Sequence, residues 1–253
     1  MMTREQMLET TNLAAGAFRE GLGDRLVSVV LHGSVLTDDF DPKRSDANLL
    51  VTLTETGMDE LDRCLGLVHR WRKKRVATPL FLTQSDIASS LDTFPVEFLN
   101  MRRAYSVLEG TDVLSGLGFD PGHVFRQCER EMKGKLILLR QGWMSSGSRD
   151  RDLAGLMAET VSTFAFLFNG ILHALGREVP KTRAESLSQG CGAMGLDDGH
   201  FLKILEIRAQ GKPSRGENVS GLFRAYLADI RAAVRFVDEK TAGPHAAAPE
   251  EVS

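Results

Sequence analysis

The chain has 253 residues, of which 42% are hydrophobic and 26% are charged, and its formal net charge is −3. This composition is ordinary for a soluble globular protein, and the length allows one large domain or two of ordinary size. A protein that coats nucleic acid needs a strong positive field, so the slightly acidic balance argues against nucleic acid as a partner.

The first half of the chain alternates helical and strand patterns. Apolar residues recur at helical spacing over residues 5–22, which predicts a first helix. The β-branched run RLVSVVL at residues 25–31 predicts a strand that is buried on both faces and stops at Gly33. An acidic loop follows, and ANLLVTL at residues 47–53 predicts a second buried strand.

Further helices and strands continue this alternation. Residues 58–75 predict a helix with a strongly basic end, HRWRKKR, and TPLFLT at residues 78–83 predicts a strand. Residues 94–107 contain FPVEFL, which predicts an extended segment. We therefore expect a first domain over residues 1–118.

Beyond residue 118 the pattern changes to long helical periods without a convincing strand. Glycine, serine and proline separate five candidate helices, at residues 121–144, 150–175, 182–194, 197–210 and 215–239. We therefore predict a helical bundle domain over residues 119–240, whose apolar stripes fit either an intramolecular core or a homodimer interface. Residues 241–253 (TAGPHAAAPEEVS) contain prolines but no hydrophobic stripe, so we expect a flexible tail.

Cysteine usage and the N-terminus bear on the compartment. The three cysteines, Cys64, Cys128 and Cys191, form no CxxC pair, which predicts neither a disulfide framework nor a zinc cluster and favours the cytoplasm. The N-terminus carries charges throughout and lacks the apolar core of a signal peptide. No segment approaches the roughly 20 apolar residues of a membrane span. We expect neither export nor membrane binding.

One stretch, LHGSVLTDDFDPKRSDANLLV at residues 31–51, carries the chemistry that the sequence suggests. Gly33 has no Cβ, so the backbone there allows close approach of a phosphate, and the Ser34 hydroxyl can donate a hydrogen bond to a phosphate oxygen. Residues at alternate positions of a strand face the same side, so Asp46 and Asn48 are expected to point the same way. Arg44, just before Asp46, is a further candidate to neutralise phosphate.

This stretch resembles the signature of the nucleotidyltransferase superfamily, the polymerase-beta-like fold of aminoglycoside nucleotidyltransferases and minimal nucleotidyltransferases. In that family a hydrophobic strand ends in Gly-Ser, and two carboxylates separated by one residue follow. The resemblance implies an α+β fold, in which a nucleotidyltransferase-like mixed sheet with flanking helices precedes an all-helical bundle domain. It also implies magnesium-dependent transfer of a nucleoside monophosphate from an NTP to a hydroxyl acceptor.

The sequence departs from the family pattern at Asn48, which stands where the second carboxylate is expected. Its neutral carbonyl is a weak ligand, because Mg²⁺ sites of this type use charged oxygens and substrate phosphates. The resemblance also gives Glu97, within PVEFL, as a third carboxylate on a later strand. The expected metal ligands are thus Asp46, Asn48 and Glu97, the catalytic residues Asp46 and Glu97, and the phosphate-binding residues Gly33, Ser34 and Arg44.

Two hypotheses follow from this departure, beside a third in which the chain is a structural or assembly protein that binds no nucleotide. In the first, the protein is a magnesium-dependent enzyme that acts on an NTP and a small-molecule or protein acceptor, with loop acids Asp38, Asp39 or Asp41 replacing the missing charge. In the second, it is a pseudoenzyme that binds a nucleotide or a protein partner without turnover. Removing one positioned electrostatic group from an active site commonly lowers the rate on the order of 10²- to 10³-fold, which favours the second hypothesis.

Several residues in this region have a simpler structural explanation. Glu97 is equally well explained as a helix cap or an ion-pair partner. Lys43 and Arg44 fit a solvated loop, and the basic run at residues 69–75 fits the exposed end of a helix better than a site that attracts phosphate.

Overall fold

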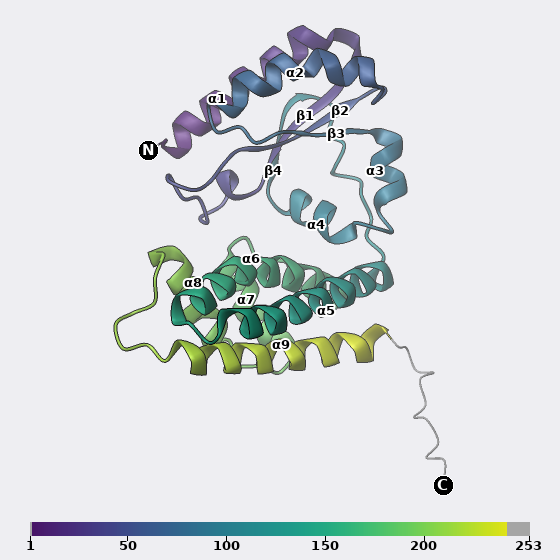
Figure 1. Cartoon of the computed structure of the whole chain (residues 1–253). Coiled ribbons are helices and arrows are strands. Elements are labelled where there is room, and N and C mark those ends of the chain that lie inside the picture. Colours follow the sequence, from purple (N-terminus) through teal and green to yellow (C-terminus); the bar gives the residue numbers. More distant parts are fainter. Residues whose placement is uncertain (1, 242–253) are drawn as a thin grey trace. The chain divides into compact units, whose positions relative to one another are not determined.

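The computed structural model describes residues 2–241, and the chain divides into two compact units (Figure 1). Unit 1 ends at Phe119 and unit 2 begins at Asp120. Unit 1 contains a mixed sheet with helices and unit 2 is helical, so the predicted α+β fold class is confirmed. The predicted tail lies outside the described residues except for Thr241, the last residue of helix α9.

Unit 1 is built on a four-stranded sheet with the strand order β3-β2-β1-β4. Strand β1 is antiparallel to both of its neighbours, whereas β2 and β3 are parallel, so the sheet is mixed. The two central strands, β1 and β2, are almost wholly buried, as their continuous apolar runs predict. The strands are β1 (Leu26–His32), β2 (Asn48–Leu53), β3 (Leu80–Thr83) and β4 (Tyr105–Gly110).

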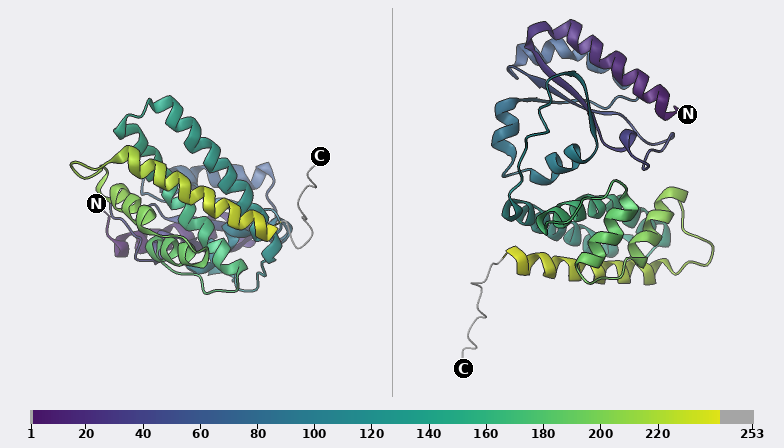
Figure 2. Two further views of the ribbon diagram at one scale, coloured as in Figure 1. Left: turned by 90° about the horizontal axis from the view of Figure 1, so that it is seen from below. Right: turned by 180° about the vertical axis from the view of Figure 1, so that it is seen from behind.

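Two helices, α1 (Arg4–Leu22) and α2 (Met58–Arg72), lie side by side on one face of this sheet (Figures 1 and 2). They bury Phe18 of α1 and Trp71 of α2 in one apolar cluster with alternate residues of β1 and β2, such as Val29. Helix α1 begins at a capping box in which Thr3 and Gln6 bond each other's backbone N–H groups. The two helices thus cover one face of the sheet and bury its apolar side chains.

The segment after β3 differs from the prediction. FPVEFL is not extended: after the short helix α3 (Gln84–Ser90), these residues begin helix α4 (Pro95–Arg103). Pro95 occupies the first helical turn, where a missing N–H removes no intrahelical bond, and Val96, Phe98 and Leu99 are buried. The strand of this region comes later, as β4.

Unit 2 packs its helices around α6 (Asp150–Ala174), which contacts all four of the others. Phe164, Phe168, Phe201 and Tyr226 meet edge to face in its core, with ring centres 5.2–6.3 Å apart. The buried Tyr226 hydroxyl lies 3.2 Å from the Thr160 hydroxyl. The other helices are α5 (Pro121–Ser146), α7 (Arg183–Ala193), α8 (Gly199–Gln210) and α9 (Val219–Thr241).

Helix α6 is long and apolar enough to cross a membrane by length and composition. The packing gives another reason for its composition, because 61% of its most apolar window is buried inside the protein. Its apolar residues therefore form the core of a globular unit. All three cysteines, Cys64, Cys128 and Cys191, are buried and free.

Candidate functional site

The glycine turn after β1 and the start of β2 lie side by side. His32 and Asn48 are partners in the β1–β2 register, so the two strands place Gly33 next to Asn48. Gly33 has a φ of 89°, a conformation that favours glycine, and a Cβ at this position would lie 3.2 Å from Asn48 Nδ2. The fold therefore joins two of the residues that the sequence singled out.

Ser34 is tied to the loop that leads to Asp46. Its hydroxyl lies 3.2 Å from the Ser45 hydroxyl, to which it donates a hydrogen bond, and the same Ser45 oxygen accepts one from the backbone N–H of Asp41 at 2.9 Å. Arg44 is exposed in this loop, and its backbone N–H donates to the carbonyl of Asp41 at 3.2 Å. The loop thus brings Ser34 close to the residue that precedes Asp46.

Asp46 forms an ion pair with Arg75, the last residue of the basic run that the sequence analysis assigned to an exposed helix end. Arg75 Nε donates to Asp46 Oδ1 at 3.2 Å, with 55% of the Asp46 side chain and 27% of the Arg75 side chain exposed. Arg75 Nη1 donates to the carbonyl of Pro42 at 2.7 Å, and Nη2 donates to the carbonyl of Ser45. The guanidinium therefore balances the Asp46 charge and holds the loop.

Backbone pairing fixes Asp46 and Arg75 beside each other. The N–H of Ala47 donates to the Arg75 carbonyl at 2.9 Å, and the N–H of Ala77 donates to the Ala47 carbonyl at 2.9 Å. These bonds surround a parallel bridge between Ala47 and Val76. No local sequence pattern indicates this pairing, because the two segments meet only when β3 joins β2.

Glu97 does not lie on a strand, so this part of the prediction is wrong. It lies in the first turn of α4, where an acidic side chain is favoured by the helix dipole. On the side of β2 away from β1 the neighbouring strand is β3, whose residues LFLT include no carboxylate, whereas β4, which pairs with β1, contains Glu109. The third carboxylate that the resemblance implies on a later strand is thus missing from β3.

The side chains of this site do not fit a two-metal centre. Within residues 2–241, no group of three or more His, Cys, Asp and Glu side chains is arranged to hold a metal ion. Asp46 is paired with Arg75 and Asn48 is neutral, whereas Mg²⁺ is usually held by one or two carboxylates together with substrate phosphates and waters, at close to octahedral geometry. The loop acid Asp38 lies 3.7 Å from Arg4, with 89% of its side chain exposed.

His32 contributes no positive charge at neutral pH. Burial lowers the pKa of its imidazole from 6.5 to about 4, because a charged ring would lose its hydration. The ring is therefore neutral next to the Gly33 turn.

A pocket of unit 1 lies beside the Asp46–Arg75 pair and is strongly basic. Its volume is about 580 Å³, and we call it the basic pocket. It contains four cationic side chains, one of which is the same Arg75. Its lining residues are Met2, Pro42, Lys43, Lys73, Lys74 and Arg75.

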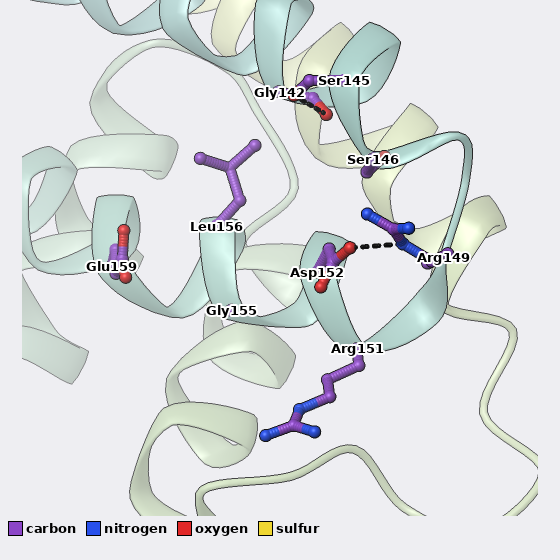
Figure 3. Close-up of a pocket in the computed structure, with 9 residues that line it drawn as sticks. All are labelled: Gly142, Ser145, Ser146, Arg149, Arg151, Asp152, Gly155, Leu156 and Glu159. Carbon is purple, nitrogen blue, oxygen red and sulfur yellow. Dashed lines mark hydrogen bonds and ion pairs between the residues drawn. The ribbon is translucent and has the colours of Figure 1, made fainter.

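A pocket of unit 2, about 430 Å³ in volume, is balanced in charge (Figure 3). It lies where α5 ends and α6 begins, and its two arginines, Arg149 and Arg151, are matched by Asp152 and Glu159. Arg149 Nε donates to Asp152 Oδ2 at 2.6 Å, as the dashed line in Figure 3 shows. Charge alone therefore gives this pocket no preference for anions.

Comparison with known proteins supports the fold. No protein-family model and no curated protein sequence matches the chain. Among solved structures, the chain is similar to spectinomycin adenyltransferase AAD(9) from Enterococcus faecialis, solved with ATP and spectinomycin, with a TM-score of 0.55 and 12% identity. The match covers 88% of this chain and 99% of that chain. This chain therefore has the nucleotidyltransferase fold, with a mixed-sheet unit followed by a helical one, as its resemblance to the superfamily predicted.

Proposed function

We propose that this protein binds a nucleoside triphosphate without transferring its nucleoside monophosphate. The observation that carries the proposal is the Asp46–Arg75 ion pair next to Asn48. Nucleotidyl transfer requires carboxylates that hold metal ions. At the corresponding positions this chain has Asp46, whose charge is balanced by Arg75, and the amide Asn48.

The magnitude of the defect supports loss of turnover. Removing one positioned electrostatic group typically lowers a rate on the order of 10²- to 10³-fold. At position 48 this chain has an amide, and the carboxylate two residues before it, Asp46, is paired with Arg75. Groups that act as a unit are not additive, but two defects in one centre leave little basis for efficient transfer.

Nucleotide binding is supported by the parts of the site that are intact. The Gly33 turn has the backbone conformation that allows close approach, and Ser34 presents its hydroxyl beside the same turn. Arg44 adds a cation from the neighbouring loop. The similar adenyltransferase was solved with ATP, which favours an NTP as the ligand of this fold.

The second candidate function is transfer of a nucleoside monophosphate to a hydroxyl acceptor. One observation favours it: the similar structure that holds ATP also holds spectinomycin and is covered over 99% of its length. In this case Asp46 and Glu97 act with Mg²⁺, and the acceptor is a small molecule or a protein. Another group must then supply the charge that Asn48 lacks.

The deciding experiment is calorimetric titration of the four NTPs in Mg²⁺, together with a pyrophosphate-release assay with and without spectinomycin. Three proteins are compared: the natural chain, Asn48→Asp, and Asn218→Asp. The last is a matched control, because it adds the same charge in unit 2 and keeps the side-chain oxygen that accepts from the Gly221 N–H.

We expect the natural chain to bind at least one NTP and to release no pyrophosphate above background. Asn48→Asp is expected to make NTP binding depend on Mg²⁺, because it adds a charged oxygen beside Asp46, whereas Asn218→Asp should behave as the natural chain does. Pyrophosphate release by the natural chain would establish the second candidate. Absence of NTP binding by the natural chain would refute nucleotide binding.

A further inference from the structure

The basic pocket gathers cations from two segments that are distant in sequence. Lys43 comes from the loop before β2, whereas Lys73, Lys74 and Arg75 follow α2. The usual explanation for basic residues at the end of a helix is its partial negative charge. That explanation fits the last turn of α2, but it does not account for Lys43, which belongs to another segment.

The three lysines of the pocket are exposed. Within residues 2–241, no carboxylate forms an ion pair with Lys43, Lys73 or Lys74, and all three side chains belong to exposed residues. Lys74 lies over the ring of Trp71, with Nζ 4.9 Å from the ring centre, which orients its stem without neutralising it. The field in the pocket is therefore positive.

Arg75 connects the basic pocket to the Gly-Ser turn. Its guanidinium bonds the Ser45 carbonyl, and the Ser45 hydroxyl accepts a hydrogen bond from Ser34, the residue after Gly33. Arg75 and the Gly-Ser turn thus contact the same residue of this loop, Ser45. A phosphate chain is an extended ligand with several charges, which suits a row of cations better than a single one.

We propose that the basic pocket binds the phosphate chain of a nucleoside triphosphate directly, without a divalent cation. The proposal rests on the nucleotide-binding function above and assigns the charge-neutralising role to Lys43, Lys73 and Lys74, while Arg75 pairs with Asp46 and holds the loop beside them. Lysine binds phosphate as a point charge, so the three lysines together replace the positive charge that metal ions usually supply.

The test measures binding of ATP and of inorganic triphosphate by calorimetry, in Mg²⁺ and in EDTA. The variant Lys73→Gln/Lys74→Gln removes two exposed charges from the pocket and leaves Arg75 and the loop in place. The matched control, Lys181→Gln/Lys212→Gln, removes two exposed charges from unit 2 and changes the net charge equally. Far-UV circular dichroism checks that both variants fold.

We expect both ligands to bind in EDTA, the pocket variant to bind them about tenfold more weakly, and the control to bind them as the natural chain does. Because the lysines are exposed, binding should also weaken as ionic strength rises, since salt screens charges over about 10 Å at 0.1 M. ATP binding that requires Mg²⁺, or that is unchanged in the pocket variant, overturns the role of the pocket while nucleotide binding stands.

The remaining outcomes separate the two proposals. If triphosphate binds in EDTA and is weakened only in the pocket variant, but no NTP binds under any condition, the basic pocket is an anion site and the nucleotide-binding function is refuted. If neither ATP nor triphosphate binds, both proposals are refuted.

Discussion

The stability of unit 1 depends on pH through His32, because the imidazole is buried at the end of β1. Its pKa is about 4 in the folded chain and 6.5 when the ring is solvated. Between these values the unfolded chain binds a proton that the folded chain does not, so unfolding becomes more favourable as the pH falls. The stabilisation is complete above pH 6.5 and is lost toward pH 4, and over the whole interval it amounts to about 3 kcal/mol.

We predict that the free energy of unfolding of unit 1 falls by about 2 kcal/mol between pH 7.5 and pH 5, and that His32→Gln removes most of this change. The chain has two tryptophans, so a Trp143→Phe background lets Trp71 fluorescence report unit 1 alone during urea unfolding. Asp86 and Asp112, whose pKa values are lowered by hydrogen bonds, also make stability depend on pH. Both are present in the natural chain and in His32→Gln, so their contribution is the same in the two proteins. An equal pH dependence in the two proteins would show that His32 is not the titrating group.

At the scale of elements, helix α7 approaches α6 closely because a glycine faces an aromatic side chain. A Cβ at Gly190 would lie 2.6 Å from the Cβ of Phe168, closer than two carbon atoms can pack. Gly192, two residues later in the same helix, has nothing within 4 Å of its Cβ position. Comparing substitutions at Gly190 and Gly192 therefore separates the effect of packing between the helices from the effect of helix propensity.

We predict opposite effects of alanine at these two positions. Gly190→Ala is expected to lower the stability of unit 2 by about 1–3 kcal/mol, because the new methyl forces α7 away from α6. Gly192→Ala is expected to raise it by up to about 1 kcal/mol, because alanine restricts the unfolded chain and favours the helix. Urea unfolding followed through Trp143 in a Trp71→Phe background measures both. A stabilising Gly190→Ala would mean that the two helices are not held at this distance.

The whole molecule consists of two compact units, each with its own apolar core. In unit 1 that core lies between the sheet and α1 and α2, and in unit 2 it is the edge-to-face cluster around Phe201. Units of this size with separate cores can unfold separately. The pH effect of His32 and the packing effect of Gly190 are then expected to stay within their own units.

We predict that Phe201→Ala lowers the stability of unit 2 by about 3–5 kcal/mol, because it empties a fully buried site that three other rings contact. The Trp143 transition in urea should shift strongly, and the Trp71 transition of unit 1 should not shift. The Trp71→Phe background reports the transition of unit 2, and the Trp143→Phe background reports the transition of unit 1. A shift of equal size in both transitions would show that the units unfold as one.

Local sequence patterns predicted most of the helices and strands, and the segment FPVEFL, which they assigned wrongly, shows their limit. The apolar runs of β1 and β2 and the long periods of the five helices of unit 2 appear in the structure within a few residues of their predicted bounds. FPVEFL has the apolar and aromatic composition of a strand, yet it forms α4, because Pro95 fits a first helical turn and its neighbours find a core to fill. Short apolar runs do not determine their own secondary structure; burial against the rest of the fold does.

The sequence by itself predicted the nucleotidyltransferase fold, through the resemblance of one segment, and it showed the Gly33–Ser34 pair and Asn48, because these can be read from that segment alone. Only the tertiary structure decided the state of Asp46. Arg75 is 29 residues away along the chain and meets it because the segments around Ala47 and Val76 pair in parallel beside β2 and β3. The same pairing brings Lys43 to Lys73 and Lys74. Such pairings arise from backbone hydrogen bonds between distant strands, which no local pattern contains.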